Sequence, residues 1–262
     1  MSKRFFIATA LSIAFLMLAV GMSSCRKEAA SEVERIKESG TLVVLTSAEL
    51  PPYEYLDDNN TPIGIDIRIA ESIAEALGVE LQVKNMDFSR LIYALEDGEG
   101  DMVISGMTVT QKAIRSADFS TIYSTFSQYI IVGVDEEEIT GAETLPGTVI
   151  GVQRDTTADF YATDDSGAKS VQRFDSVADA VAALIAGNVD SVIADGITAR
   201  AIVKDNASAL KVIANPLTEE SFSVAVSKGS DLLDIVNNVI TKLVADGTID
   251  SLTLAYTYPS GS

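Results

Sequence analysis

Apolar residues recur along this chain with two alternating periods, one typical of strands and one typical of helices. Residues 42–45 form a continuous apolar run, as expected of a strand that is buried on both faces of a sheet. Apolar residues between positions 70 and 77 then repeat at helical spacing, and Gly78 ends that helix. Residues 79–83 alternate like a strand. This succession predicts parallel sheets that are covered by helices.

The alternation continues to the end of the chain, with one break between Val134 and Val149. Because the chain is also longer than the usual ~100 to 200 residues of one domain, we predict two lobes. The first lobe comprises residues 32–131 and 227–262, the second comprises 132–226, and two strand crossings between them form a hinge. The other predicted elements are helices over 88–96, from about Thr156, over 176–186 and over 232–245, strands over 102–104, 126–134, 149–152, around Val171, over 191–194 and over 224–226, and crossings near Ile131–Asp135 and Phe222–Val226.

The first residues have the pattern of an export signal. Lys3 and Arg4 precede an apolar stretch over 5–20, which is about the length of a signal-peptide core and short for a membrane span of roughly 20 residues. The stretch runs into Met22-Ser23-Ser24-Cys25, which resembles a lipobox, in which the new N-terminal cysteine carries lipid. We therefore predict a lipoprotein signal peptide over 1–24, a tether over 25–31 and lipidation of Cys25. An ordinary cleaved signal and an uncleaved anchor stay open as alternatives.

Composition excludes several classes of function. The formal charge of −19 repels polyphosphate, so nucleic acid is a poor partner. Since the chain has no histidine, it cannot build imidazole catalysis or most zinc sites. Its single cysteine permits no internal disulfide. Neither a Gly-Lys-Ser/Thr phosphate loop nor a Gly-x-Ser-x-Gly elbow is present. We expect no cofactor, no metal site and no catalytic residue.

Seven short motifs occur in one order between Ser31 and about Tyr256. They are Pro51-Pro52-Tyr53-Glu54-Tyr55, Gly64-Ile65-Asp66-Ile67, Asp87-Phe88, the run from Asp101 to Thr110, Asp118-Phe119-Ser120, Gly151-Val152-Gln153 and Ala194-Asp195. Each is weak alone, but their joint order and spacing resembles family 3 of the bacterial extracellular solute-binding proteins. The resemblance implies a type II periplasmic-binding-protein fold, an α/β fold with a mainly parallel sheet in each lobe and a two-strand hinge.

The same resemblance implies ligand-binding residues in the first lobe. The loop after the strand over 102–104 would supply backbone groups and a hydroxyl from Ser105, Met107 and Thr108. Alternatively, this segment is a strand-to-helix turn whose hydroxyl groups cap a helix at Thr110. Tyr53 and Phe88 match the aromatic positions that cover a ligand, although core packing is the commoner role of an aromatic residue.

In the second lobe, the resemblance makes Asp195 the acid that binds the ligand's ammonium group. Asp195 also stands where it could cap the helix that follows Gly196, and both roles are compatible. Gln153, Thr156 and Thr157 match the turn whose backbone N–H groups face the ligand's carboxylate. Asp155 stands in this turn where a glycine is usual, and we interpret it as a helix cap.

The largest departure from the family pattern is Ala113. It occupies the position, three residues after Thr110, where these receptors carry the arginine that binds the ligand's carboxylate. Arg115 lies about 200 degrees further around a helix, so it should point elsewhere. Keeping Asp195 while losing the arginine indicates a cationic or neutral nitrogenous solute whose carboxylate is absent or masked, unless Arg90 or Arg154 reaches the cleft.

The function implied by these residues is capture of a small polar solute for an ABC permease of the inner membrane. The protein would be exported, periplasmic or at the cell surface, anchored by its N-terminal lipid, and monomeric. Two alternatives have different consequences. An enzyme on the same fold, similar to cyclohexadienyl dehydratase, would act on substrates with carboxylates. Ala113 counts against this alternative, because the arginine that would bind a carboxylate is missing. A surface lipoprotein without a transport role would have no use for the cleft.

Overall fold

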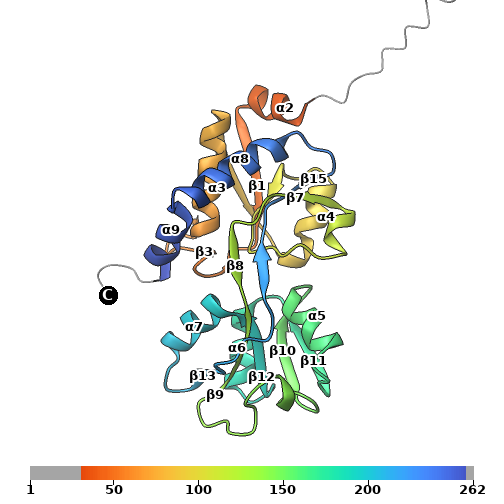
Figure 1. Ribbon diagram of the computed structural model, residues 1–262, viewed down its shortest axis with the longest axis vertical. Helices are drawn as coiled ribbons and strands as arrows, with labels where there is room; N and C mark the ends of the chain where they lie inside the picture. The colour runs from red at the N-terminus through yellow and green to blue at the C-terminus, as the bar shows by residue number, and fades with distance from the viewer. Residues whose placement is uncertain (1–30, 258–262) are drawn as a thin grey trace, which may run out of the picture. The chain divides into compact units, whose positions relative to one another are not determined.

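The computed structural model describes residues 31–257, in which helices and strands alternate as predicted (Figure 1). The predicted signal peptide and Cys25 lie outside the described residues. Within them, two five-stranded sheets are surrounded by helices, which confirms the α/β fold class. No helix in residues 31–257 is both long enough and apolar enough to cross a membrane.

The sheet of the first lobe has the strand order β5-β1-β6-β15-β7. Strand β1 is parallel to β5 and β6, whereas β15 is antiparallel to β6 and β7. The bounds are β1 Thr41–Thr46, β5 Glu80–Asn85, β6 Met102–Val103, β7 Ala117–Phe119 and β15 Ala225–Ser227.

The sheet of the second lobe has the order β11-β10-β12-β9-β13. Here β10 is parallel to β11 and β12, and β9 is antiparallel to β12 and β13. The two sheets therefore share one topology, although the sequence shows no repeat. The bounds are β9 Gln128–Gly133, β10 Val149–Gln153, β11 Ser170–Phe174, β12 Ser191–Asp195 and β13 Leu210–Val212.

The segments that connect the two sheets pair with each other. β8 (Ser124–Phe126) is antiparallel to β14 (Glu220–Phe222). We expected one crossing near Ile131–Asp135, but β9 already belongs to the second sheet from Gln128 onward. The apolar run over 129–132 lies within β9, so it follows the crossing and does not mark it.

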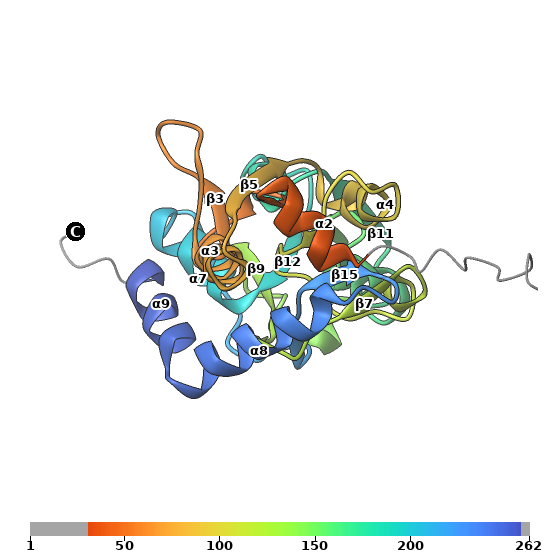
Figure 2. The same ribbon diagram turned by 90° about the horizontal axis from the view of Figure 1, so that it is seen from above.

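Helices cover both faces of each sheet, which explains why the central strands are continuous apolar runs. In the first lobe, Leu42 and Val44 pack on one face against α3, α8 and α9, while Leu45 packs on the other face against α4. Figure 2 shows α8 and α9 on the opposite side of this lobe from α4. In the second lobe, α5 covers one face and α6 and α7 cover the other. The bounds are α3 Ile65–Leu77, α4 Leu91–Glu96, α5 Thr157–Asp164, α6 Val177–Ile185, α7 Gly196–Asp205, α8 Leu232–Ala245 and α9 Thr248–Thr257, with short 3-10 turns at Phe88–Arg90, Ala113–Arg115 and Ala142–Thr144.

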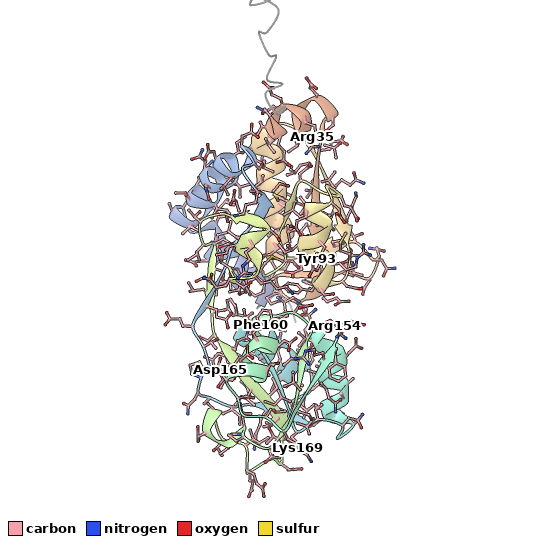
Figure 3. The ribbon with its side chains drawn as sticks, turned by 90° about the vertical axis from the view of Figure 1, so that its right-hand side faces the viewer. Arg35, Tyr93, Arg154, Phe160, Asp165 and Lys169 are labelled. Atoms are coloured by element: carbon pink, nitrogen blue, oxygen red, sulfur yellow. The ribbon has the colours of Figure 1, made fainter. Side chains whose placement is uncertain are left out.

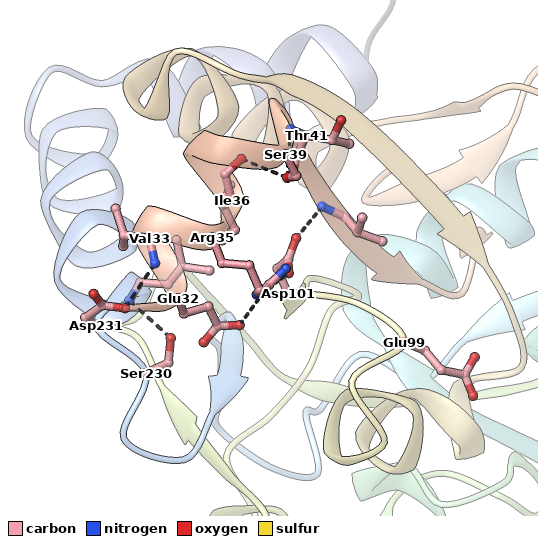
Figure 4. Close-up of polar contacts among 12 residues, drawn as sticks. Glu32, Val33, Arg35, Ile36, Ser39, Thr41, Glu99, Asp101, Ser230 and Asp231 are labelled. Atoms are coloured by element: carbon pink, nitrogen blue, oxygen red, sulfur yellow. Dashed lines mark hydrogen bonds and ion pairs between the residues drawn. The ribbon is translucent and has the colours of Figure 1, made fainter. Parts of the chain in front are cut away.

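Helix α2 (Glu32–Ser39) is held to the first sheet by a buried carboxylate (Figure 4). Asp101 accepts a hydrogen bond from the backbone N–H of Val43 at 2.7 Å and pairs with Arg35. The carboxylate of Asp231, just before α8, accepts from the N–H of Val33 at 3.2 Å. Asp101, a motif residue of the sequence analysis, therefore has a structural role.

A small sheet that the sequence analysis did not predict lies before α3. Its strands are β2 (Glu49–Leu50), β3 (Glu54–Leu56) and β4 (Pro62–Ile63). Gly64 joins this sheet to α3 with φ of 128°, and a Cβ atom there would lie 2.2 Å from the carbonyl oxygen of Tyr53. This close approach lets the N–H of Asp66 donate to the same oxygen at 2.9 Å. Glycine is therefore required at position 64 by backbone contact.

We expect Gly64→Ala to destabilise the protein far more than Gly40→Ala. Gly40 also has a positive φ, 71°, but no atom lies within 4 Å of an added Cβ. The control should lose about 1 to 2 kcal/mol of unfolding free energy from backbone strain alone. Gly64→Ala adds overlap with Tyr53 and should lose more than about 3 kcal/mol in urea denaturation. Equal losses would contradict the close approach.

Candidate functional site

A cleft is lined by residues from both lobes, and most of them follow the carboxyl ends of parallel strands, where ligands bind in open α/β sheets. In Figure 3, Tyr93 of the first lobe and Phe160 of the second lie at the facing ends of the two lobes, and both line this cleft. Seven of the nine predicted ligand residues are on its wall, namely Phe88, Met107, Thr108, Gln153, Thr156, Thr157 and Asp195.

Asp195 ends β12 and is buried, with 4 % of its surface exposed. Its Oδ1 accepts from the N–H groups of Ile197 and Thr198 at 3.1 and 3.0 Å, so it caps α7. Its Oδ2 is buried and has no partner among the described residues. Burial raises the pKa of this carboxyl group, while the bonds from Thr198 and Ile197 and the charge of Arg200 oppose the rise. Oδ1 therefore has a structural role as the cap of α7, whereas Oδ2 is free to accept a hydrogen bond.

Gln128, which the sequence analysis missed, offers a second acceptor on the same wall. Its Nε2 donates to the hydroxyl of Thr157 at 3.1 Å, which fixes the orientation of the amide. The Oε1 is buried without a partner among residues 31–257. Position 128 lies at the start of β9, where the residue pattern indicated only a strand, so no sequence signal marked it.

The turn before α5 is capped by Thr156, so our interpretation of Asp155 as the helix cap is wrong. The hydroxyl of Thr156 accepts from the N–H of Asp159 at 3.2 Å and donates to the carbonyl of Gln153 at 2.8 Å, so Thr156 is the N-cap. Thr157 and Ala158, the first residues of α5, line the cleft. Asp155 has φ of 60°, a left-handed conformation that suits the glycine expected there.

Ser105 and Tyr53 are not on the cleft wall. The hydroxyl of Ser105 is buried, accepts from the N–H of Ser47 at 3.0 Å and donates to Glu54 at 2.9 Å, so its bonding capacity is used inside the first lobe. Tyr53 is fully buried and packs edge-on against Phe222, with ring centroids 4.9 Å apart. We expected Tyr53 to be accessible to a ligand, and this is wrong in the described conformation because the ring points into the core.

The two crossing strands add aromatic rings to the cleft wall, beside Phe88, Tyr93 and Phe160. Phe126 and Phe222 stack with centroids 4.0 Å apart, and both line the cleft. The backbone of Met107 is bonded to the same region, because its carbonyl accepts from the N–H of Ser223 at 2.9 Å. The backbone of Thr108 forms an isolated antiparallel β-bridge with Phe222, and the hydroxyl of Thr108 lies 3.4 Å from a carboxylate oxygen of Glu220. The crossing strands thus hold the loop after β6.

Positive charge at the cleft is confined to one side chain. Lys112 is the one lysine or arginine among the described lining residues, and its Nζ lies 3.1 Å from Asp155 Oδ1 of the opposite lobe. Ala113 lies beside it on the wall. Arg90 and Arg154 do not line the cleft, because they turn toward Glu99 and Asp175 at 3.8 and 3.6 Å. In this conformation, neither therefore replaces the carboxylate-binding arginine that the family carries at the position of Ala113.

Within residues 31–257, no group of three or more acidic, cysteine or histidine side chains could hold a metal ion. Two residues of the described wall carry unpartnered acceptors, Asp195 Oδ2 and Gln128 Oε1, and they lie in a cleft that aromatic rings also line. Such a site suits a ligand that carries donors.

Comparisons with known proteins agree with this geometry. The family model of the bacterial extracellular solute-binding proteins, family 3, matches residues 42–258. The arginine-binding extracellular protein ArtP of Bacillus subtilis is 30 % identical over 257 residues, which cover 96 % of each chain. The chain therefore belongs to family 3 of the bacterial extracellular solute-binding proteins, as the sequence motifs predicted.

Solved structures show the same two-lobe fold. A substrate-binding protein of an amino acid ABC transporter, AbpA from Streptococcus pneumoniae bound to L-arginine, has a TM-score of 0.81 at 30 % identity, covering 86 % of this chain and 97 % of that one. The ancestral amino acid-binding protein AncCDT-1, a precursor of cyclohexadienyl dehydratase, has a TM-score of 0.80 at 31 % identity, covering 87 % and 100 %.

The helix-capping role of Asp195 can be separated from the effect of its buried charge by substitution. Asp195→Ser and Asp195→Ala both remove the buried charge, but serine keeps an N-cap oxygen for α7. We expect the unfolding free energy of the alanine variant, measured in urea, to be about 0.5 to 2 kcal/mol below that of the serine variant. If the two variants unfold at the same urea concentration, the cap contributes nothing and the capping role is wrong.

Proposed function

We propose that this protein is the solute-binding component of an ABC importer and that it captures a small nitrogenous solute with an ammonium or guanidinium group. The observation that carries the proposal is the buried, unpartnered Oδ2 of Asp195 on the cleft wall. A buried carboxylate oxygen without a donor is costly, and a cationic ligand would supply that donor. The unpartnered Oε1 of Gln128 on the same lobe supports a donor-rich ligand.

The charge of the cleft supports a ligand without a free carboxylate. Lys112 is paired with Asp155, and Ala113 presents no cation. Leaving a buried carboxylate without a charged partner costs about 3 to 5 kcal/mol. The N-terminus of α5 offsets about 2 kcal/mol of this at best. A decarboxylated or amidated derivative of a basic amino acid avoids the cost, whereas a free amino acid bears it.

Relatives that bind arginine agree with the cationic half of this proposal. They include the Bacillus subtilis protein and the streptococcal protein described above. In the proposal, the solute's cation binds Asp195 and its apolar part lies against Phe126 and Phe222. The absence of the carboxylate-binding arginine at Ala113 then distinguishes the selectivity of this protein from that of relatives that bind free arginine.

An enzyme on the same fold is the alternative from another class, and the likeness to a dehydratase precursor is the observation that favours it. Substrates of that kind carry carboxylates, which the cleft is poorly equipped to hold. Incubation with candidate solutes and analysis of products by mass spectrometry separates the two, because a binding protein returns the solute unchanged. A surface lipoprotein without a ligand would leave Asp195 Oδ2 unexplained.

For the membrane, we propose export followed by lipidation of Cys25, with the permease as partner and the protein acting as a monomer. The family consists of extracellular proteins, and the lipobox-like residues before Cys25 support the anchor. Replacement of Cys25 by Ser should release the mature protein from membranes into the soluble fraction. A variant that stays fully membrane-bound would mean that the leader is an uncleaved anchor.

Matched ligand pairs test selectivity. Calorimetry should show that agmatine binds more tightly than L-arginine, because the two differ by the carboxylate. Ala113→Arg should shift the preference toward L-arginine by about 1.5 to 3 kcal/mol if the arginine reaches the carboxylate. Asp195→Ser, which keeps the helix cap, should weaken both ligands.

Tight wild-type binding of L-arginine that Ala113→Arg leaves unchanged would contradict the proposal. It would mean that Lys112 leaves Asp155 and binds the carboxylate instead. Lys112→Gln then serves as the control, since it should weaken L-arginine only in that case.

A further inference from the structure

Two buried carboxyl groups bind the loop that follows β6, and one of them, Glu54, also lines the cleft. Glu54 lies on β3 and Asp66 in the first turn of α3, with exposed fractions of 1 % and 0 %. The sequence analysis assigned neither of them a role at the site. The turn at Gly64 brings them together, because it bonds the N–H of Asp66 to the carbonyl of Tyr53, the neighbour of Glu54.

Each carboxyl group binds the loop through one of its oxygens. The hydroxyl of Ser105 donates to Glu54 Oε1 at 2.9 Å. The N–H of Gly106 and the hydroxyl of Tyr123 donate to Asp66 Oδ2 at 2.8 and 2.9 Å. Ser105 and Gly106 lead directly into Met107 and Thr108, which line the cleft. The carboxyl groups therefore determine where the loop lies.

The other two oxygens, Glu54 Oε2 and Asp66 Oδ1, are buried and accept no hydrogen bond from the described residues. Neither group forms an ion pair with a described lysine or arginine, and the two side chains lie close together because they bind the adjacent residues Ser105 and Gly106. Two ionised carboxylates in that position would repel, since both are acceptors only. One proton between them gives both remaining oxygens a partner.

We propose that Glu54 carries this proton and donates it from Oε2 to Oδ1 of an ionised Asp66, and that the pair is the positioning element of the ligand-binding loop. Asp66 is suited to the ionised role. It accepts two hydrogen bonds and lies at the N-terminus of the 13-residue helix α3, whose dipole favours a negative charge. Glu54 accepts one bond, from a neutral hydroxyl.

The directions in which the pKa values of Asp66 and Glu54 are shifted agree with an ionised Asp66 and a protonated Glu54. Burial raises the pKa of Asp66 to about 6, against the bonds from Gly106 and Tyr123. Burial, together with the charges of Asp66 and Asp195, raises the pKa of Glu54 well above its usual range. The other titratable groups facing the pair are the hydroxyls of Tyr53 and Tyr123, whose own pKa values are raised by burial, so they stay neutral.

The pair makes stability depend on pH with a defined sign. At pH values above the ordinary glutamate pKa, the unfolded chain releases the proton of Glu54 while the folded protein keeps it. The folded state then binds more protons, so the unfolding free energy falls as pH rises, until folded Glu54 also ionises. Ionisation would place two negative charges beneath Ser105 and Gly106 and displace the loop, so ligand affinity should fall in the alkaline range.

Glu54→Gln tests the pair, since an amide can donate to Asp66 and accept from Ser105 as the protonated acid does. Glu75→Gln is the matched control, because it makes the same change at an exposed position of α3. Difference infrared spectroscopy of the wild type and the control should show the carbonyl stretch of a protonated carboxyl group at neutral pH. In Glu54→Gln this band should be absent.

A second readout is the pH dependence of stability. The unfolding free energy of Glu54→Gln should decrease less with rising pH than that of the wild type, by the equivalent of about one proton. A purely structural role for Glu54 would lower stability equally at every pH. An absent infrared band in the wild type, an unchanged pH slope, or a band that Asp66→Asn removes and Glu54→Gln keeps would overturn the assignment.

The positioning role rests on the proposed function, and its probes are agmatine and L-arginine. Glu54→Gln should keep the same affinity for the tighter probe from neutral to alkaline pH, whereas the affinity of the wild type should fall over that range. A loss greater than about tenfold in the folded variant would mean that ionised Glu54 contacts the ligand, which overturns the inference. If neither probe binds any variant, the proposed ligand class fails, while the infrared and stability measurements still decide whether the proton is shared.

Discussion

Buried carboxyl groups that accept backbone N–H bonds are the constraint on which this structure depends. Asp101 binds the N–H of Val43 beside α2, Asp66 binds that of Gly106 in the cleft loop, and Asp195 binds two at the start of α7. A buried carboxylate is costly unless its oxygens are satisfied, so each of these groups restricts the backbone around it to one arrangement. Asp195 lines the cleft, and Asp66 binds the loop that lines it. Stability and ligand binding therefore depend on the same side chains.

The distribution of charge connects the fold to the function. The chain is strongly acidic as a whole, yet the described cleft contains few ionised groups, and its lysine is paired across the lobes with Asp155. Because Lys112 and Asp155 come from opposite lobes, that pair forms only when the lobes approach. An exposed pair of this kind contributes little to stability. Asp195, in contrast, is buried, so in the proposed function a ligand that donates to its Oδ2 gains more from closure.

The crossing strands do more than connect the lobes. β8 and β14 pair with each other, and their Phe126 and Phe222 stack on the cleft wall. Phe222 also contacts Tyr53, and the neighbouring Ser223 binds the carbonyl of Met107. A rotation of one lobe must therefore be absorbed close to the loop that lines the site. This arrangement couples the position of the loop to the hinge.

The sequence by itself determined the order of strands and helices, the α/β class, the family, and Asp195 at the end of a strand. These depend on local periodicity and on motifs of adjacent residues, which need no knowledge of distant contacts. Only the tertiary structure decided which side chains reach the cleft. Tyr53 turns into the core, Ser105 bonds to Glu54, and Gln128 exposes an acceptor, because side-chain direction depends on partners far away in the chain. The proposed proton between Glu54 and Asp66 also depends on the tertiary structure. A carboxyl group keeps a proton at neutral pH only when folding removes water and places a second carboxylate beside it.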